Sequence, residues 1–236
     1  MKLTNILTEA QGLEARLLAK YENVPLQRYI SYRGSEGAGH CLIRNGKRIG
    51  GASAGTLELK ILFDLVRVID ARFSLQIGIA FGLSTLAMAE ANRNNEIIAM
   101  DNYSENEEAE PGYVQAIAQK VLADYANVRL MIACSPQDTA RCLRSIPLHE
   151  KLSLVLIDAH HTEESAMADF VGIHPYLDSH SVVLWHDIDK LSGALDNAFD
   201  KGIFDTVLRL PTWGRMGVHL NGKSHPRAIE YLKHFL

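Results

Sequence analysis

The sequence has few cysteines, and they show no metal-binding or paired spacing. Of its 236 residues only Cys41, Cys134 and Cys142 are cysteines, and none lies in a C-x-x-C motif. An odd number of cysteines without such spacing argues against a disulfide framework and against a structural zinc site. We therefore expect a protein of a reducing, cytoplasmic compartment.

Excess positive charge and long apolar runs are also missing. The formal net charge is -4, so no overall positive field would attract a nucleic-acid backbone or an anionic membrane surface. No apolar run approaches the ~20 residues that a membrane helix needs. The first 22 residues carry charges among their apolar positions, which is unlike an export signal. We expect a soluble protein with neither nucleic acid nor membrane as a partner.

The chain has enough apolar residues, 47%, for one sizeable core. A stripe at three- and four-residue steps predicts an amphipathic N-terminal helix: Leu3, Ile6, Ala10, Leu13 and Leu17. This helix would pack on the main domain or on a second subunit of a homo-oligomer. Two strand-like segments flank the turn signal Asn45-Gly46-Lys47 and predict a hairpin. We interpret residues 1–55 as an appendage and residues 56–236 as the catalytic domain.

Helix-like and strand-like segments alternate from Thr56 onward. A helical stripe over 57–69 precedes strands at 73–77, 96–100, 128–132, 152–157 and 181–185, with helices at 84–92, 113–125 and 163–173. This alternation predicts a parallel sheet with helices on both faces. Segments 206–210 and 216–220 are too close for a helical crossover and should pair antiparallel. The predicted fold is α/β: a Rossmann-like, doubly wound, mostly parallel seven-stranded sheet with an antiparallel C-terminal strand.

The turn after the first of these strands has the features of a ligand-binding loop, because ligands of such sheets lie outside the carboxyl ends of the strands. Gly78 and Gly82 allow a tight turn, and the free N–H groups near Ser84 favour a carboxylate or phosphate. Asp101 ends the next strand, where it could accept hydrogen bonds from both hydroxyls of a ribose. Alternatively, the glycines serve only the turn and Asp101 caps a loop. Ala80 replaces the middle glycine of G-x-G-x-x-G and disfavours a dinucleotide.

With these features the chain resembles the class I S-adenosylmethionine-dependent methyltransferases. Within that class it is similar to the small O-methyltransferases related to catechol O-methyltransferase and to antibiotic-tailoring sugar methyltransferases. The resemblance covers about residues 56–220 and implies S-adenosylmethionine as the cofactor. It departs from the family at Gln76, where an acid is common, and at Ala80, where many members have glycine.

The resemblance also implies roles for individual residues. The turn would wrap the methionine part of the cofactor, Ser84 would contact its carboxylate, and Asp101 would hold the ribose. Residues 133–138 are similar to the segment that borders adenine. The candidate cofactor-binding residues are Gln76, Ile77, Gly78, Ala80, Gly82, Ser84, Thr85, Asp101, Asn102, Ser135, Gln137 and Asp158.

Acids and histidines follow the fourth and fifth strands of the predicted sheet. Carboxylates gathered there could hold a divalent cation that lowers the pKa of a substrate hydroxyl, and a histidine could take its proton. The resemblance implies Asp158, His186 and Asp187 as metal ligands, and it puts His160 where related sugar methyltransferases have an acid that acts as base. Asp158, His160 and His161 are the catalytic candidates. The ion would be magnesium or, because of the histidines, manganese, iron or zinc.

The same residues also allow purely structural roles. Asp158 could cap the helix that follows it, the two histidines could be solvated loop residues, and Asp187 could bond to nearby backbone amides. Residues 217–224 match the phosphate-loop pattern G-x-x-x-x-G-K-[ST], but Val218 and Leu220 look like strand residues inside the motif. We interpret Asn221-Gly222 as a turn.

The favoured function is metal-assisted O-methylation of a small hydroxylated molecule with S-adenosylmethionine as the methyl donor. An alternative is a non-catalytic binding or assembly module with the same fold, which the atypical Gln76, Ala80 and His186 motivate. A less favoured alternative is a nicotinamide-dependent oxidoreductase, because Asp101 could equally bind the ribose of that cofactor.

Overall fold

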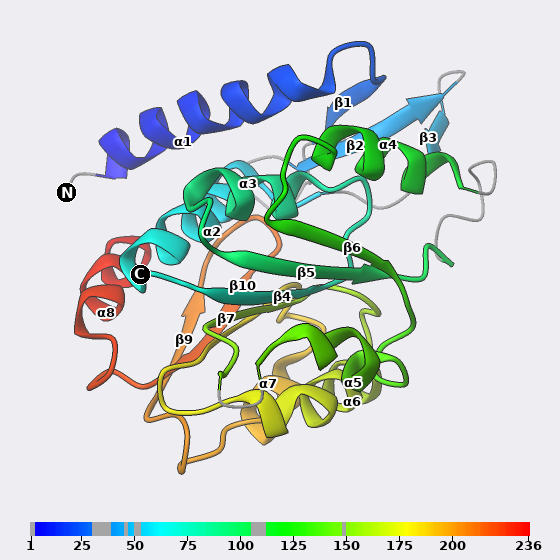
Figure 1. Ribbon diagram of the computed structural model, residues 1–236. Helices are drawn as coiled ribbons and strands as arrows, with labels where there is room; N and C mark the ends of the chain where they lie inside the picture. The colour runs from blue at the N-terminus through cyan, green and yellow to red at the C-terminus, as the bar shows by residue number, and fades with distance from the viewer. Residues whose placement is uncertain (1–2, 30–38, 45–46, 50–52, 105–111, 148–149) are drawn as a thin grey trace.

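The computed structural model describes residues 3–29, 39–44, 47–49, 53–104, 112–147 and 150–236. A seven-stranded sheet lies at its centre, between two layers of helices (Figure 1). The strands are β4 Phe73–Ile77, β5 Glu96–Asp101, β6 Val128–Ile132, β7 Leu154–Ile157, β8 Val182–Trp185, β9 Thr206–Leu210 and β10 Met216–Leu220.

The strands lie side by side in the order β6-β5-β4-β7-β8-β10-β9. All pairs from β6 to β8 are parallel, and β10 is antiparallel to both of its neighbours. The predicted fold class is therefore confirmed. Because the chain moves outward from β4 in one direction and then continues from β7 in the other, the carboxyl ends of β4 and β7 form the switch point at which such sheets bind ligands.

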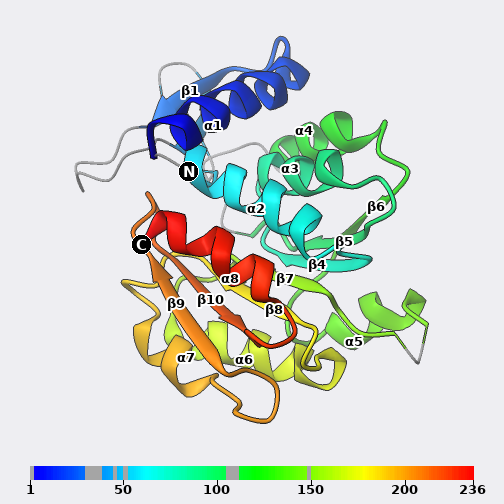
Figure 2. The same ribbon diagram turned by 90° about the vertical axis from the view of Figure 1, so that its left-hand side faces the viewer.

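Helices cover both faces of the sheet (Figures 1 and 2). One layer contains α1 Leu3–Leu18, α2 Thr56–Val68, α3 Leu83–Ala91, α4 Tyr113–Leu122 and α8 Pro226–Leu232, and the other contains α5 Thr139–Cys142, α6 Glu163–Ile173 and α7 Ser192–Asn197. Each layer packs on the sheet through its own cluster of buried apolar side chains. Short 3-10 turns lie at Ala19–Tyr21, Leu143–Ser145, His174–Tyr176 and Lys233–Phe235.

The N-terminal helix was predicted to pack either on the main domain or on a second subunit. In the structure it packs on the main domain of the same molecule. The predicted stripe of α1 is buried, from Ile6 to Leu17, and it contributes to the core that α2 shares. A separate antiparallel sheet follows, with β1 Leu26–Tyr29, β2 Gly39–Arg44 and β3 Lys47–Ile49. The pairing of β2 with β3 agrees with the predicted hairpin, whereas its turn at Asn45-Gly46 lies outside the described residues. None of the described helices is long and apolar enough to cross a membrane.

The apparent phosphate-loop motif is part of a strand. Gly217 to Leu220 belong to β10, and a turn from Asn221 leads to α8. A phosphate loop would instead follow a buried strand and open a helix. The interpretation of Asn221-Gly222 as a turn is correct.

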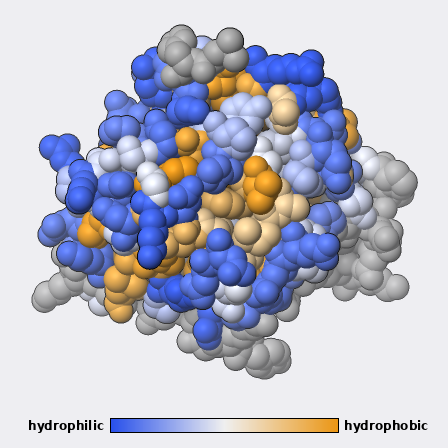
Figure 3. Space-filling model, turned by 90° about the horizontal axis from the view of Figure 1, so that it is seen from below, coloured by the Kyte–Doolittle hydropathy of each residue, from blue (hydrophilic) through white to orange (hydrophobic). Residues whose placement is uncertain are grey.

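A shallow groove of about 370 Å³ lies between the ends of α6 and α7. Apolar side chains gather on this face of the molecule among hydrophilic ones (Figure 3). Phe170, Val171 and Phe199 are among the residues that line the groove. They lie in the C-terminal part of α6 or after α7, and a helix that follows a parallel strand runs back toward the amino end of the sheet. The groove is therefore away from the carboxyl ends at which we expected the site.

Candidate functional site

The turn after β4 has an unusual backbone. Gly78, Ala80 and Gly82 have φ angles of 88°, 48° and 93°, in the left-handed region that favours glycine. A Cβ atom on Gly78 would lie 2.0 Å from the carbonyl oxygen of Asp158. Glycine is therefore required at position 78, because the chain leaving β4 touches the chain leaving β7.

Asp101 holds this turn from the end of the neighbouring strand. Its Oδ2 accepts hydrogen bonds from the backbone N–H groups of Ile79, at 2.7 Å, and Ala80, at 3.0 Å. Its Oδ1 accepts one from the N–H of Tyr103 at 2.6 Å. Asp101 thus has the loop-stabilising role that the sequence left open as an alternative. Its contact with a ribose stays a prediction. A carboxylate has about four lone-pair sites, so after these three hydrogen bonds Asp101 has limited capacity left to accept from a ribose.

Gln76 and Thr85 support the turn from the interior. Gln76 Nε2 donates to the carbonyl of Gly78 and to Ser84 Oγ, both at 2.7 Å, and its Oε1 accepts from Thr85 Oγ1 at 2.8 Å. Gln76 and Thr85 are wholly buried, and Ile77 is 1% exposed. An ionised acid at position 76 could not donate the two hydrogen bonds of Nε2, so the departure from the family pattern has a structural reason. These three residues lie behind the turn.

The cofactor candidate Asn102 and the two candidates from the predicted adenine-bordering segment, Ser135 and Gln137, lie in different surroundings. Asn102 and Gln137 are exposed, and Asn102 Nδ2 donates to Cys134 Sγ at 3.7 Å. Ser135 bonds inward, with its Oγ 3.2 Å from Thr139 Oγ1 and with a further bond to the buried Asp169. The structure therefore leaves Asn102 and Gln137 accessible to a ligand, whereas Ser135 joins this loop to α6.

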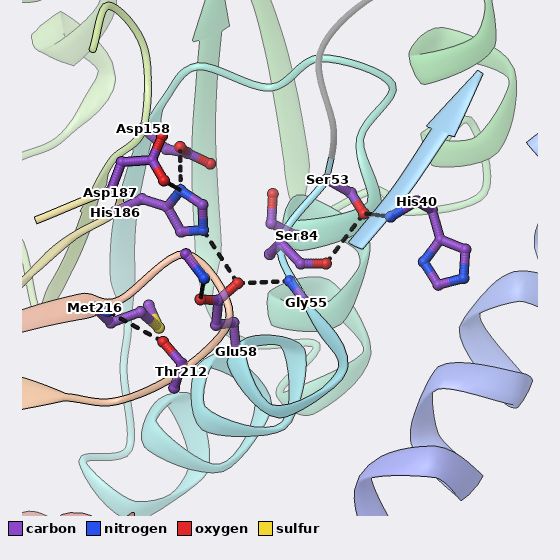
Figure 4. A network of polar contacts seen from close by, with 12 residues as sticks. His40, Ser53, Gly55, Glu58, Ser84, Asp158, His186, Asp187, Thr212 and Met216 are labelled. Carbon is purple, nitrogen blue, oxygen red and sulfur yellow. Dashed lines mark hydrogen bonds and ion pairs between the residues drawn. The ribbon is translucent and has the colours of Figure 1, made fainter. Parts of the chain in front are cut away.

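The carboxyl ends of β7 and β8 bring two of the predicted rim residues together with an acid that sequence reasoning missed. His186 Nδ1 lies 3.0 Å from Asp158 Oδ1, and His186 Nε2 lies 3.1 Å from Glu58 Oε2. Figure 4 shows His186 between Glu58 on one side and the two aspartates, Asp158 and Asp187, on the other. His186 is 5% exposed and Glu58 is wholly buried. The imidazole is thus enclosed between two carboxylates.

Glu58 joins three distant segments of the chain. It lies in the first turn of α2, and its carboxylate accepts hydrogen bonds from the N–H of Gly55 at 2.5 Å and from the N–H of Gly214 at 2.6 Å. The ring of Trp213 packs against Gly55 and against Gly39 of β2, so the N-terminal sheet also borders this region. The sequence feature that could have pointed to Glu58 is its place between Leu57 and Leu59, as an acid in an apolar helix.

Burial and charge act in opposite directions on this pair. Burial by itself raises the pKa of Glu58, but the charge of His186 and the hydrogen bonds from His186, Gly55 and Thr212 outweigh it and lower the pKa below its ordinary value. Burial by itself lowers the pKa of His186, but the charges of Asp158 and Glu58 outweigh it and hold the pKa well above its ordinary value. Each group therefore stabilises the charged form of the other.

Comparison with known proteins shows what this region is similar to. Residues 75–188 match the family model of a methyltransferase domain. This segment, slightly less than half of the chain, is therefore similar to methyltransferase domains. The matched region begins in β4 and ends just after His186, so it contains both the turn and the rim. No curated protein sequence matches the chain significantly.

Solved structures agree with this match at the level of the fold. The TDP-rhamnose 3'-O-methyltransferase of calicheamicin biosynthesis is 18% identical, with 69% of this chain and 78% of that chain covered and a TM-score of 0.54. The O-methyltransferase TomG of Streptomyces achromogenes, solved with S-adenosylmethionine, is also 18% identical, with coverages of 69% and 78% and a TM-score of 0.51. A methyltransferase from Geobacter sulfurreducens is 11% identical, with 89% and 88% covered and a TM-score of 0.52. The predicted resemblance to class I methyltransferases is confirmed.

The two neighbouring histidines after β7 have different surroundings. His160 is partly buried, and its charge acts on the carboxylate of the buried Asp169. His161 is exposed, and its Nδ1 lies 3.2 Å from Asp187 Oδ2. The helix after them is capped by Thr162, whose Oγ1 accepts from the N–H of Ser165 at 3.3 Å, so Asp158 is not its cap.

The three predicted metal ligands converge at the carboxyl ends of β7 and β8, and their binding of an ion stays a prediction. His186 Nε2 lies at hydrogen-bond distance from Glu58, whereas its buried Nδ1 has no hydrogen-bond partner and lies 3.0 Å from Asp158 Oδ1. Asp187, at a left-handed φ of 54°, accepts from Lys190 Nζ at 2.9 Å and lies 3.8 Å from His186 Nδ1. Within the described part of the chain, no group of three or more histidine, cysteine or acidic side chains is arranged to hold a metal ion.

Proposed function

We propose that the protein is an S-adenosylmethionine-dependent O-methyltransferase that acts on a small hydroxylated molecule. The observation that carries this proposal is the contact between Gly78 and Asp158 at the switch point of the sheet. It brings the cofactor turn and the acidic rim of a methyltransferase domain to the same edge. A methyl donor held on the turn would thus lie beside groups that can bind and deprotonate an acceptor.

The turn supplies the groups that a nucleoside with an amino-acid tail needs. The first N–H groups of α3 and the hydroxyl of Ser84, which accepts from Gln76 and so directs its own hydrogen elsewhere, would hold the carboxylate. Asp101 would accept from a ribose hydroxyl, and Asn102 and Gln137 would border the base. When bound, S-adenosylmethionine supplies a methyl group on a positively charged sulfur. The residues behind the turn keep its backbone in the left-handed conformation.

His160 is the proposed base for the acceptor hydroxyl. It is partly buried and lies within the electrostatic reach of the buried Asp169, and histidine is the side chain that most often takes the proton in such a step. His161 differs because its ring faces Asp187, which also binds Lys190. The proton therefore moves from the acceptor oxygen to the imidazole of His160 as the oxygen attacks the methyl group.

Calorimetric titration with S-adenosylmethionine and with its demethylated product tests the cofactor. We expect saturable binding of both ligands, with affinity reduced at least tenfold in Asp101→Asn, a loss of the order of one charge-assisted hydrogen bond. Glu96→Gln, at the exposed opposite end of the same strand, should bind like the wild type. Absence of binding at millimolar ligand would refute the proposal, and fluorescence titration with a reduced nicotinamide cofactor would then test the oxidoreductase alternative.

Turnover separates an enzyme from a binding module of the same fold. Transfer of a labelled methyl group to a panel of phenols, sugars and hydroxy acids should label at least one acceptor. Cofactor binding without transfer across the whole panel would instead favour a non-catalytic module.

A further inference from the structure

We propose that Tyr21 is a positioning residue for the turn after β4, so that the N-terminal helix α1 contributes to the affinity for the methyl donor. The hydroxyl of Tyr21 donates a hydrogen bond to the backbone carbonyl of Phe81 at 3.0 Å, across 60 residues of sequence. The inference rests on the proposed function for the identity of the ligand. One of its tests is made on the free protein and needs neither methyl donor nor acceptor.

Both residues of this contact are removed from water. Tyr21 is 3% exposed and Phe81 is 1% exposed. Their rings meet edge to face, with centroids 5.9 Å apart and an interplanar angle of 89°. A buried backbone carbonyl needs a hydrogen-bond donor, and a buried tyrosine hydroxyl needs a partner of its own. The contact satisfies both groups at once and therefore fixes the direction of the Phe81 carbonyl.

This carbonyl belongs to the peptide group that joins the turn to α3. The N–H of the same peptide group, on Gly82, donates to the carbonyl of Ile79 at 2.9 Å, and Gly82 has a left-handed φ of 93°. The peptide group is thus held at its oxygen by Tyr21 and at its nitrogen by the turn itself. Helix α3 begins at the next residue, Leu83, and its first N–H groups are the ones proposed to hold the carboxylate of the cofactor. A rotation of this peptide group would redirect them.

Tyr21 holds the turn from a different part of the chain than the residues behind it. Asp101 on β5 and Gln76 on β4 bind the first part of the turn, from Gly78 to Ala80. Tyr21 instead binds its last part, and it lies in the 3-10 turn that follows α1. The N-terminal segment therefore completes a support that the central sheet begins.

The N-terminal helix is fixed in place, so it gives Tyr21 a firm base. Helix α1 packs on α2 and α3 (Figure 1). Glu14 accepts a hydrogen bond from Thr56 Oγ1 at 2.7 Å, and Glu9 lies 3.2 Å from Lys60 Nζ. The docking of α1 and the conformation of the turn are thus coupled through Tyr21. Because such coupling is reciprocal, a cofactor that binds the turn more tightly when α1 is docked must also strengthen the docking of α1.

Cofactor affinity is the first test. Tyr21→Phe removes the hydroxyl and keeps the ring, and Tyr125→Phe is the matched control. Tyr125 is 2% exposed, and Lys20 Nζ lies 6.0 Å from its ring centroid, but its hydroxyl donates to Glu90 and not to the turn. We expect Tyr21→Phe to weaken calorimetric binding of S-adenosylmethionine roughly three- to tenfold, the net value of one hydrogen bond.

The loss should appear in KM for the methyl donor and not in kcat, because Tyr21 acts on the turn and touches no reacting atom. Tyr125→Phe should bind S-adenosylmethionine like the wild type, although it also loses a buried hydroxyl. Unchanged affinity in Tyr21→Phe would overturn the proposal. Equal losses in the two variants would also overturn it, because they would reflect a general loosening of the fold.

Hydrogen exchange in the free protein is the second test. The amide of Gly82 should exchange faster in Tyr21→Phe than in the wild type, because its peptide group is then held at one atom only. Tyr125→Phe should leave this rate unchanged. An unchanged rate in Tyr21→Phe would refute the role of Tyr21, whatever ligand the protein binds. Faster exchange in a protein that does not bind S-adenosylmethionine would refute the proposed function and still support Tyr21 as the residue that positions the turn.

The wild type supplies a third test, which does not depend on the folding of a variant. The demethylated product of S-adenosylmethionine should slow amide exchange in the turn and also in Ala19–Tyr21. Exchange in α7, which lies in the opposite layer of helices (Figure 1), should not change. Slower exchange in the turn without any change in Ala19–Tyr21 would overturn the coupling.

Discussion

The two halves of the site are built in different ways. The proposed cofactor half consists of backbone groups in left-handed conformations. Asp101 and Gln76 bind them to β5 and β4, which are neighbouring strands joined by a single crossover. The charged half consists of side chains from α2, from the ends of β7 and β8, and from the loop before β10. The first half depends on glycines and amides, and the second depends on charges removed from water.

This difference predicts different sensitivities to substitution. A backbone turn tolerates changes of side chain as long as its φ angles are kept, whereas a buried charge pair fails when either partner is removed, because the other charge then stays unpaired in a low dielectric. Changes in the charged half should therefore affect chemistry and stability strongly, and changes in the cofactor half should act mainly on ligand affinity.

His160→Ala sharpens the comparison most. If deprotonation belongs to the charged half, kcat should fall by roughly 10²–10⁴, the usual contribution of a general base, with little change in the affinity for S-adenosylmethionine. His161→Ala, one position further along, should lower kcat by far less. Methyl transfer and calorimetry on the two variants give both quantities. Equal losses of kcat in both variants would move the base elsewhere.

Glu58→Gln tests the stability of the charged half. The substitution leaves His186 with one carboxylate in a buried site, so the free energy of unfolding should fall by about 3–5 kcal/mol. Glu163→Gln should cost less than about 1 kcal/mol, because Glu163 is exposed. Urea unfolding at pH 7 measures both. A loss in Glu58→Gln no larger than in its control would show that the pair adds nothing to the fold.

The histidine on β10 shows that burial alone does not charge an imidazole. His219 is wholly buried among the rings of Trp185, Phe199 and Phe204, with centroids 5.7, 5.9 and 5.3 Å away. Burial lowers its pKa from 6.5 to about 4. Between these values the unfolded chain takes up a proton that the folded chain does not. This histidine should therefore lower the free energy of unfolding as the pH falls from about 6.5 to about 4, by about 3 kcal/mol in all.

The contribution of His186 to stability changes with pH in the opposite direction, because its pKa is raised in the folded protein. Its contribution to stability is fully present below pH 6.5 and is lost as the pH rises through the folded pKa. Urea unfolding of the wild type and of His219→Leu at pH 7, 5.5 and 4.5 isolates the His219 part, since other groups contribute equally to both. Parallel pH profiles would contradict a neutral His219.

Ala80→Gly should have the smallest effect and the opposite direction. Ala80 has a left-handed φ of 48°, a conformation that costs a residue with a Cβ roughly 1 kcal/mol and costs glycine little. The variant should therefore unfold at higher urea, by roughly 0.5–1 kcal/mol. Ala91→Gly, at the right-handed end of α3, should lose stability instead. If both glycines destabilise the protein to the same extent, the turn is not strained at Ala80.

Sequence reasoning predicted the elements of the sheet and its helices to within a few residues, because apolar periodicity and glycines act locally. The missed elements, β1, α5 and α7, are short and have little periodicity. The gathering of the candidate site residues was also predictable, since the carboxyl ends of parallel strands meet at one edge. Gln76 was noted as atypical, but its two donated bonds became visible only when Ser84 was placed beside it.

The sequence by itself determined the fold class, the left-handed turn at Gly78 and Gly82, and the convergence of Asp158 with His186, because each of these follows from local patterns and strand order. Only the tertiary structure placed Glu58 beside them. Glu58 lies 128 residues from His186 along the chain, and no local pattern connects an acid in an apolar helix with a histidine after a distant strand. Whether an imidazole binds a metal or acts as a cation depends on the charges that packing places around it.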